Sequence, residues 1–175
     1  MRKFFGHLNT VMRHRRKVFV HCVKAGIPWR GLLHDLSKYA PTEFFEGVKH
    51  FIGNRSPNEG ERAEKGYSLA WIHHKGRNRH HFEYWTDYSP VTKRIEPVKM
   101  PIVFVKEMFC DRVAASKVYQ GKDYTDGHPI MYFSGGKGRR LIHPETSDII
   151  ESWLVMLSEK GEKETFSHIK SVRDY

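Results

Sequence analysis

The first 25 residues carry an apolar stripe with the period of an α-helix. Its members recur at steps of three and four residues, and this spacing places them on one face of a helix over residues 3–25. Gly26 and Pro28 follow, glycine being typical of a helix end and proline of the start of the next helix. The stripe comprises Leu8, Val11, Met12, Arg15, Val18, Phe19, Cys22 and Val23. The chain therefore opens on a long amphipathic helix.

The rest of the chain shows the same helical periodicity and almost no strand signal. Further helices are expected over residues 29–39, 42–53, 61–75, 100–120 and about 144–160. Residues 54–60 and 87–97 are expected to be irregular, and residues 121–142 to form either a hairpin or a short helix and loop. The charged tail from Glu159 is expected to fray. The sequence thus predicts an all-α fold, a bundle of five to six helices with little or no strand, in a single domain over residues 1–175.

Composition limits the class of protein. The two cysteines, Cys22 and Cys110, lie in expected helices, so a disulfide framework is not expected. No apolar run is long enough to span a membrane and the N-terminus lacks signal-peptide features, so we expect a cytoplasmic protein without a membrane partner. The net charge of +10 has two possible interpretations. It indicates either a generally basic surface or a surface that attracts phosphate-bearing partners such as nucleotides and nucleic acid. Basic residues cluster only at 13–17 and 137–140.

Histidine and aspartate residues stand out within apolar segments. His34 and Asp35 are adjacent in an apolar helical segment, where both are costly to bury unless they are paired or bind a ligand such as a metal ion. The other candidates are His7, His14 and His21 at intervals of seven, the doublets His73/His74 and His80/His81, and Asp111. Taken singly, each histidine is more typical of a surface or packing role. The set as a whole favours a metal site assembled from several helices.

Residues 32–38, Leu-Leu-His-Asp-Leu-Ser-Lys, resemble the signature of the HD superfamily of metal-dependent phosphohydrolases. That superfamily binds metal through a histidine on the first helix, an adjacent His-Asp pair and a distant aspartate, and many members add histidines for a second metal. The resemblance implies an HD-like helical bundle with a metal-site core over about residues 5–120. The ligands that it implies are His14, His34, Asp35, His74, His80, His81 and Asp111. His21 stays an alternative to His14, and which member of the second doublet binds stays open.

A narrower resemblance links most of residues 5–115 to an uncharacterised bacterial and phage family with HD-like features and no assigned function. It is carried by residues 13–14, 26–44 and 74–81. In that family the histidine matching His74 recurs and the one matching His73 does not, so His74 is the favoured ligand. Ser37 stands where the superfamily usually has glycine. The loop motifs of cyclic-dinucleotide phosphodiesterases are not evident after His81, which disfavours a cyclic dinucleotide as substrate.

The resemblance implies a divalent-metal-dependent phosphohydrolase that acts on a nucleotide or related phosphoester through a metal-activated water. Nitrogen and oxygen ligands without thiolate suit one or two ions of Mn, Fe, Co, Ni or Zn, and Asp35 is the natural bridging ligand. The catalytic candidates are Asp35, Lys38 and Glu83, and the candidates for holding a substrate phosphate are Lys38, Arg77 and Arg79.

Two other classes of function stay open at this point. One is a di-iron oxygenase, because some HD-like proteins hold two irons. The other is a non-enzymatic basic protein that binds nucleic acid or a partner and keeps only a structural metal site. The metal content of protein purified without a histidine tag separates both enzymes from a protein of the last class whose histidine and aspartate set is degenerate.

Overall fold

The computed structural model describes residues 1–53, 55–136 and 138–175, and these residues are mostly helical. The helices are α1 (Arg2–Lys24), α2 (Pro28–Leu33), α3 (Pro41–Lys49), α4 (Pro57–Lys65), α5 (Leu69–Lys75), α6 (Ile102–Gln120), α7 (His128–Ser134) and α8 (Pro144–Ser171). Short 3₁₀ helices span Leu36–Tyr39, Phe82–Tyr84 and Gly121–Asp123. The predicted all-α class is confirmed. The predicted count of five to six helices is wrong, because the described residues form eight α-helices.

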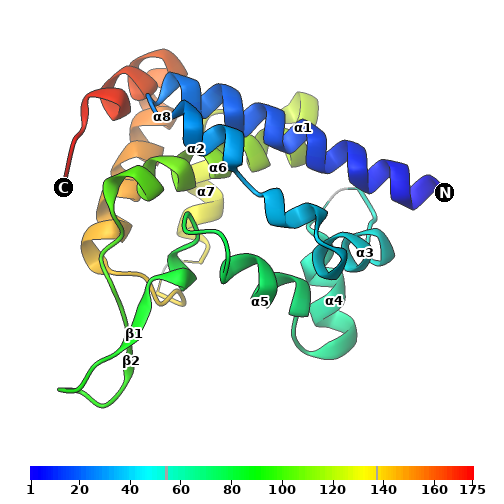
Figure 1. Ribbon diagram of the computed structural model, residues 1–175. Coiled ribbons are helices and arrows are strands. Elements are labelled where there is room, and N and C mark those ends of the chain that lie inside the picture. The colour runs from blue at the N-terminus through cyan, green and yellow to red at the C-terminus, as the bar shows by residue number, and fades with distance from the viewer. Residues whose placement is uncertain (54, 137) are drawn as a thin grey trace.

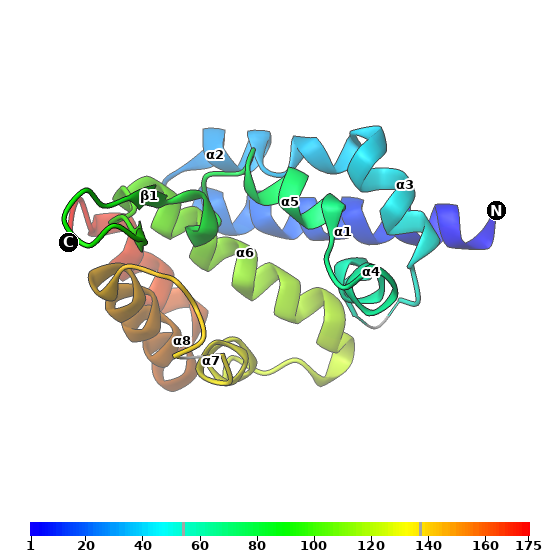
Figure 2. The ribbon, with the colours of Figure 1, turned by 90° about the horizontal axis from the view of Figure 1, so that it is seen from below.

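The helix α1 is long and lies along the upper side of the molecule in the view of Figure 1, where several other helices pack against it. It packs against α2, α3, α6 and α8. Figures 1 and 2 place α3 and α4 near the N-terminal half of α1 and α8 near its C-terminal half, so the chain termini lie at opposite ends. The helix α6 crosses α1 and leads toward α7 and α8 (Figure 2). Two helices distant in sequence, α1 and α6, thereby form the centre of the fold.

The apolar core lies where α1, α6 and α8 meet. Phe109 on α6 is fully buried and makes edge contacts with two rings of α8, at 6.1 Å from the centroid of Trp153 and 5.5 Å from that of Phe166. Burying side chains of this size contributes about 1.5–3 kcal/mol each. The core is completed by Val18, Cys22, Val105, Met108, Val113, Ile150, Leu154, Leu157 and Ile169. The core therefore fixes the crossing of α1 and α6.

The C-terminal tail is part of this core, and the expectation that it frays from Glu159 is wrong. The helix α8 continues to Ser171 across a kink at Gly161, whose positive φ of 75° is unfavourable for residues with a side chain. Beyond the kink, Phe166 and Ile169 are buried against α1 and α6. The kink turns the end of α8, residues 162–171, back onto the core. The charged composition of this segment does not reveal that it packs there.

Three other expected segments differ from the structure. The expected helix over 61–75 is two helices, because Gly66 adopts the left-handed conformation (φ 80°) and Ser68 caps the start of α5 by accepting a hydrogen bond from Trp71 N. The expected loop at 54–60 ends early, because Pro57 starts α4. Residues 87–97, expected to be irregular, contain an antiparallel hairpin of β1 (Thr86–Tyr88) and β2 (Ile95–Pro97).

Residues 121–142, left open between a hairpin and a short helix, contain α7. The basic cluster at 137–140 includes Lys137, which lies outside the described residues. No helix in the described part of the chain has the length and apolar character that a bilayer crossing requires.

Candidate metal centre

The His34–Asp35 pair lies at a sharp break in the chain. The helix α2 ends at Leu33, His34 is extended (φ −55°, ψ 130°), and Asp35 is left-handed (φ 53°, ψ 32°). This region is sparsely populated by residues other than glycine, although aspartate tolerates it better than most. The expectation that the pair sits within a continuous helix over 29–39 is therefore wrong. Both side chains are nonetheless buried, with exposed fractions of 1% and 2%.

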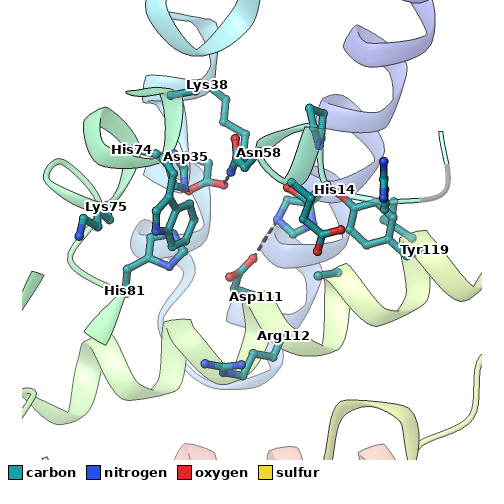
Figure 3. Close-up of a pocket in the computed structure, with 18 of the residues that line it drawn as sticks. His14, Asp35, Lys38, Asn58, His74, Lys75, His81, Asp111, Arg112 and Tyr119 are labelled. Atoms are coloured by element: carbon teal, nitrogen blue, oxygen red, sulfur yellow. Dashed lines mark ion pairs between the residues drawn. The ribbon is translucent and has the colours of Figure 1, made fainter. Parts of the chain in front are cut away.

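Donors from three other parts of the chain lie near the pair, and Figure 3 shows Asp35 in one pocket with His14, His74 and Asp111. His74 Nε2 on α5 lies 3.3 Å from Asp35 Oδ1, and His80 Nε2, in the loop after α5, lies 3.5 Å from the same oxygen. On the other side, His14 Nε2 on α1 lies 2.9 Å from Asp111 Oδ1 on α6. Elements separated by up to 97 positions in the sequence, from His14 to Asp111, thus supply one cluster.

The cluster contains three sets of side chains that could each hold a metal ion, because one donor atom from every member lies within 4.8 Å of the others. The sets are Asp35 with His74, His80 and His81; His14 with His34 and Asp35; and His34 with His80 and Asp111. Each of the seven predicted ligands belongs to at least one set. Asp35 belongs to two sets, which suits a carboxylate shared by two ions.

Several buried donor atoms of the cluster lack hydrogen-bond partners among the described residues. They are His34 Nε2, Asp35 Oδ1, His80 Nε2 and His81 Nε2. A buried polar atom without a partner costs about 1–3 kcal/mol. A divalent cation would satisfy all four, since imidazole nitrogen and carboxylate oxygen are its usual ligands. The residues present therefore fit a metal of the Mn, Fe, Co, Ni or Zn type.

The electrostatics of the cluster keep its two carboxylates in the ionised form that metal binding requires. Burial alone would raise the pKa of Asp35, but the charges of His34, His74 and Lys38 hold it well below its usual range. Asp111 behaves similarly, with His14 and His34 lowering its pKa against the effect of burial. Both carboxylates are therefore ionised at neutral pH.

The histidines of the cluster divide into two kinds. Burial, followed by the charges of His80 and His74, lowers the pKa of His81 well below its usual value. Burial, followed by the charge of Lys38, also lowers the pKa of His74. His34 differs, because Asp35, Asp111 and Glu107 outweigh burial and raise its pKa well above the usual value. Metal binding at His34 would therefore displace a proton.

A buried glutamate on α6 orients two of these imidazoles. Glu107 is fully buried, and its Oε1 accepts a hydrogen bond from His34 Nδ1 at 3.0 Å and lies 3.3 Å from His80 Nδ1. Its Oε2 accepts a hydrogen bond from Arg30 Nε at 2.7 Å. Burial would raise the pKa of Glu107, but the hydrogen bonds from His34 and His80 lower it to about 2. A carboxylate that holds Nδ1 leaves Nε2 directed at the cluster.

Glu43 on α3 plays the same part for the doublet on α5. Its two oxygens accept hydrogen bonds from His73 Nδ1 and His74 Nδ1, each at 2.7 Å. His73 is therefore a neighbour of the cluster rather than a member. The sequence interpretation missed both glutamates. Glu107 was detectable, because it precedes Asp111 by one helical turn in an apolar helix, whereas Glu43 gives no comparable signal.

The cluster opens into a cavity of about 940 Å³ that is lined by Asp35, His74, His81 and Asp111. Lys38 lines it too, with Nζ 3.4 Å from Asp35 Oδ2 (Figure 3). Burial opposes its charge, but the carboxylates of Asp35, Glu43 and Asp111 raise the pKa of Lys38, which therefore stays protonated.

The other predicted substrate-binding and catalytic residues divide between the cavity and the surface. Glu83 lines the cavity, its Oε2 has no described partner, and burial raises its pKa. Arg77 and Arg79 are exposed and do not line the cavity. Arg77 donates to His73 O at 3.4 Å, and the Arg79 guanidinium lies 5.7 Å from the centroid of the Tyr84 ring. Between them Asn78 turns inward and donates to Ser37 Oγ at 2.8 Å, so its neighbours on either side turn outward.

His21, the alternative to His14, lies in the apolar core. It is stacked on the Phe166 ring at 5.3 Å, and its Nδ1 lies 3.3 Å from Cys110 O. Seven residues correspond to about 10 Å along a helix, so His14 and His21 cannot reach the same ion. The structure brings His14, and not His21, to the cluster.

The buried position of His21 predicts a loss of stability in mild acid. Burial, followed by the charge of Lys117, lowers the pKa of His21 to about 4 in the folded chain, against about 6.5 when unfolded. The unfolded state therefore gains a proton first, and stability falls as the pH drops from 6.5 to 4, by up to about 3 kcal/mol. His21→Phe, which cannot be protonated, should show a shallower fall in urea-unfolding free energy over this range. Equal slopes in the two proteins would contradict the prediction, and the exposed His168→Ala serves as control.

Comparison with known proteins gives one match. A search of curated proteins and a search of solved structures find none, so neither supplies an activity or a fold to compare. A family model described as a family of unknown function (DUF5662) matches residues 3–156, which include every residue of the cluster. The chain belongs to this family of unknown function, DUF5662.

Proposed function

We propose that the protein is a divalent-metal-dependent phosphohydrolase with an HD-like fold, acting on a nucleotide or related phosphoester. The observation that carries the proposal is the convergence of buried donor atoms without partners on a cluster whose imidazoles are oriented by Glu43 and Glu107. The order of the cluster along the chain is also the order of the HD signature. The helical class agrees with this assignment.

In this proposal the ligands form two groups around a shared Asp35. His14 and His34 would complete one site, with Asp111 beside His14 at 2.9 Å, and His74, His80 and His81 would complete the other. When bound, such ions supply an acidified water and neutralise charge on phosphoryl oxygens. The absence of thiolate donors in the cluster, within the described residues, fits metals that accept nitrogen and oxygen ligands.

The chain's own residues then bind and position the substrate. The ammonium group of Lys38 faces the cavity beside Asp35 and would hold a phosphoryl oxygen. Glu83, whose pKa is raised by burial, keeps a proton more readily than an exposed carboxyl and would donate it to the leaving oxygen.

The test is the metal content and phosphatase activity of untagged protein. We expect near-stoichiometric metal by plasma mass spectrometry, lost in His34→Ala and retained in the exposed control His168→Ala. We also expect Mn²⁺-dependent phosphate release from a nucleotide panel. Wild-type protein without stoichiometric metal would overturn the proposal in favour of a non-enzymatic role. Bound iron with oxygen uptake and no phosphate release would overturn it in favour of a di-iron oxygenase.

A further inference from the structure

Two of the arginines that line the cavity lie against the same aromatic ring, outside the candidate metal centre. Arg112 follows Asp111 on α6, and Arg140 lies in the segment between α7 and α8. Both guanidinium groups lie against one ring, that of Phe133, with their central carbons 5.1 Å and 4.7 Å from its centroid. Figure 3 shows the Arg112 guanidinium apart from the His14–Asp111 pair. The fold therefore gathers two cations at a second place in the same cavity.

Within the described part of the chain, the Nε donor of Arg112 has no hydrogen-bond acceptor. This Nε is buried, and in residues 1–53, 55–136 and 138–175 no carboxylate forms an ion pair with Arg112. By contrast, Arg30 is paired with Glu107, and Arg15 donates to His34 O at 2.8 Å. Arg112 is half-buried, and its buried Nε without an acceptor costs free energy that a bound anion would recover.

Arg140 is held in place while keeping donors for a ligand. Its Nη1 donates to Phe133 O at 2.5 Å and its Nη2 to Tyr132 O at 3.3 Å, both at the C-terminal end of α7. Gly136 allows this approach, because a Cβ there would lie 2.3 Å from Arg140 Nη2. Neither hydrogen bond uses Nε. A guanidinium fixed by backbone carbonyls loses little further freedom when an anion binds.

We propose that Arg112 and Arg140 form an anion subsite for a second phosphate group of the substrate. The planar guanidinium fork matches phosphate oxygens and binds them through charge-assisted hydrogen bonds. A cavity of about 940 Å³ has room for both groups. The substrate class is then a phosphoester with two phosphates, one at the metal centre and one at the arginines. This substrate class rests on the proposed function, whereas the anion subsite itself does not.

The first experiment measures the subsite without any metal. Full-length protein treated with chelator is titrated with inorganic pyrophosphate by calorimetry. We expect binding by the wild type, weakened about tenfold or more in Arg112→Gln and Arg140→Gln, as for loss of a charge-assisted hydrogen bond. The control Arg94→Gln removes an equal charge from the exposed turn between β1 and β2 and should bind like the wild type.

Two results overturn the subsite. One is no binding by wild-type protein, and the other is equal affinity in the wild type and Arg112→Gln. Circular dichroism checks that each variant is folded. If Arg112→Gln does not fold, Arg112→Lys is tested instead, because lysine keeps the positive charge and lacks the guanidinium fork. Wild-type affinity for pyrophosphate in Arg112→Lys would overturn a subsite that depends on the fork.

The second experiment tests the substrate class in metal-loaded enzyme. The ratio of kcat/KM for a nucleoside bisphosphate to that for the monophosphate should fall about tenfold or more in Arg112→Gln. An unchanged ratio overturns the substrate class. Failure of the proposed function can be told apart from failure of the subsite. If no variant hydrolyses any substrate, the proposed function fails, and the pyrophosphate titration, which needs no hydrolysis, still tests the subsite.

Discussion

Asp35→Asn should remove both metal ions and reduce phosphate release by about 10²–10³-fold or more, the loss expected when charge stabilisation in the transition state is removed. Asp35 belongs to two of the three potential ligand sets, and its Oδ1 lies near both His74 Nε2 and His80 Nε2. Asparagine keeps the shape of the side chain but removes the charge that attracts the cation. The effect should therefore exceed that of losing a histidine that belongs to one set only, namely His14, His74 or His81.

His14→Ala is the comparison that isolates the bridging role of Asp35. His14 belongs to one set only, so its loss should reduce the metal content to one ion and leave the set of Asp35, His74, His80 and His81 intact. Metal stoichiometry by mass spectrometry and phosphate release measured on the same samples distinguish the two variants. Equal metal content in Asp35→Asn and wild-type protein would contradict the assignment of Asp35 as a ligand.

The members of the cluster could be predicted from the sequence because the signal is local. Histidine and aspartate are conspicuous in apolar segments, as with His34 and Asp111, and their order matches a known pattern. The structure brings all seven predicted ligands together, while their role as ligands stays a prediction. The sequence did not reveal the backbone conformation that brings these side chains together. The left-handed conformation of Asp35 is set by tertiary packing. The helical periodicity of the sequence continues through this position and therefore does not predict the break.

The residues that support the cluster were harder to predict for the same reason. Glu107 contacts His34 across 73 positions of sequence, and Glu43 contacts His74 across 31. Such pairs depend on which helices approach each other, which periodicity does not determine. For Arg77 and Arg79 the opposite problem arises, because closeness in sequence wrongly indicated closeness in space. They are adjacent in sequence to the cluster yet exposed, because Asn78 takes the inward position between them.

Glu107→Gln should weaken metal binding about 10–100-fold, the usual cost of removing a carboxylate that orients a metal-binding histidine. Glutamine keeps the length of the side chain, but a neutral amide oxygen is a weaker acceptor for His34 Nδ1 and no longer balances Arg30. Loss of these charge-assisted hydrogen bonds should also lower the free energy of unfolding by about 1.5–3 kcal/mol. Metal titration of chelator-treated protein and urea unfolding measure the two effects.

Glu162→Gln separates the orienting role of Glu107 from a general loss of stability. Glu162 also has a pKa lowered to about 2, and it pairs with Lys24 at the C-terminal end of α1 and with Lys117 on α6. Its replacement should lower stability without changing metal affinity. If the two variants lose stability and metal affinity in the same proportion, Glu107 acts only through the stability of the fold. If only Glu107→Gln loses metal affinity, its carboxylate positions the imidazoles, because both variants remove one ionised glutamate while only one of the two touches the cluster.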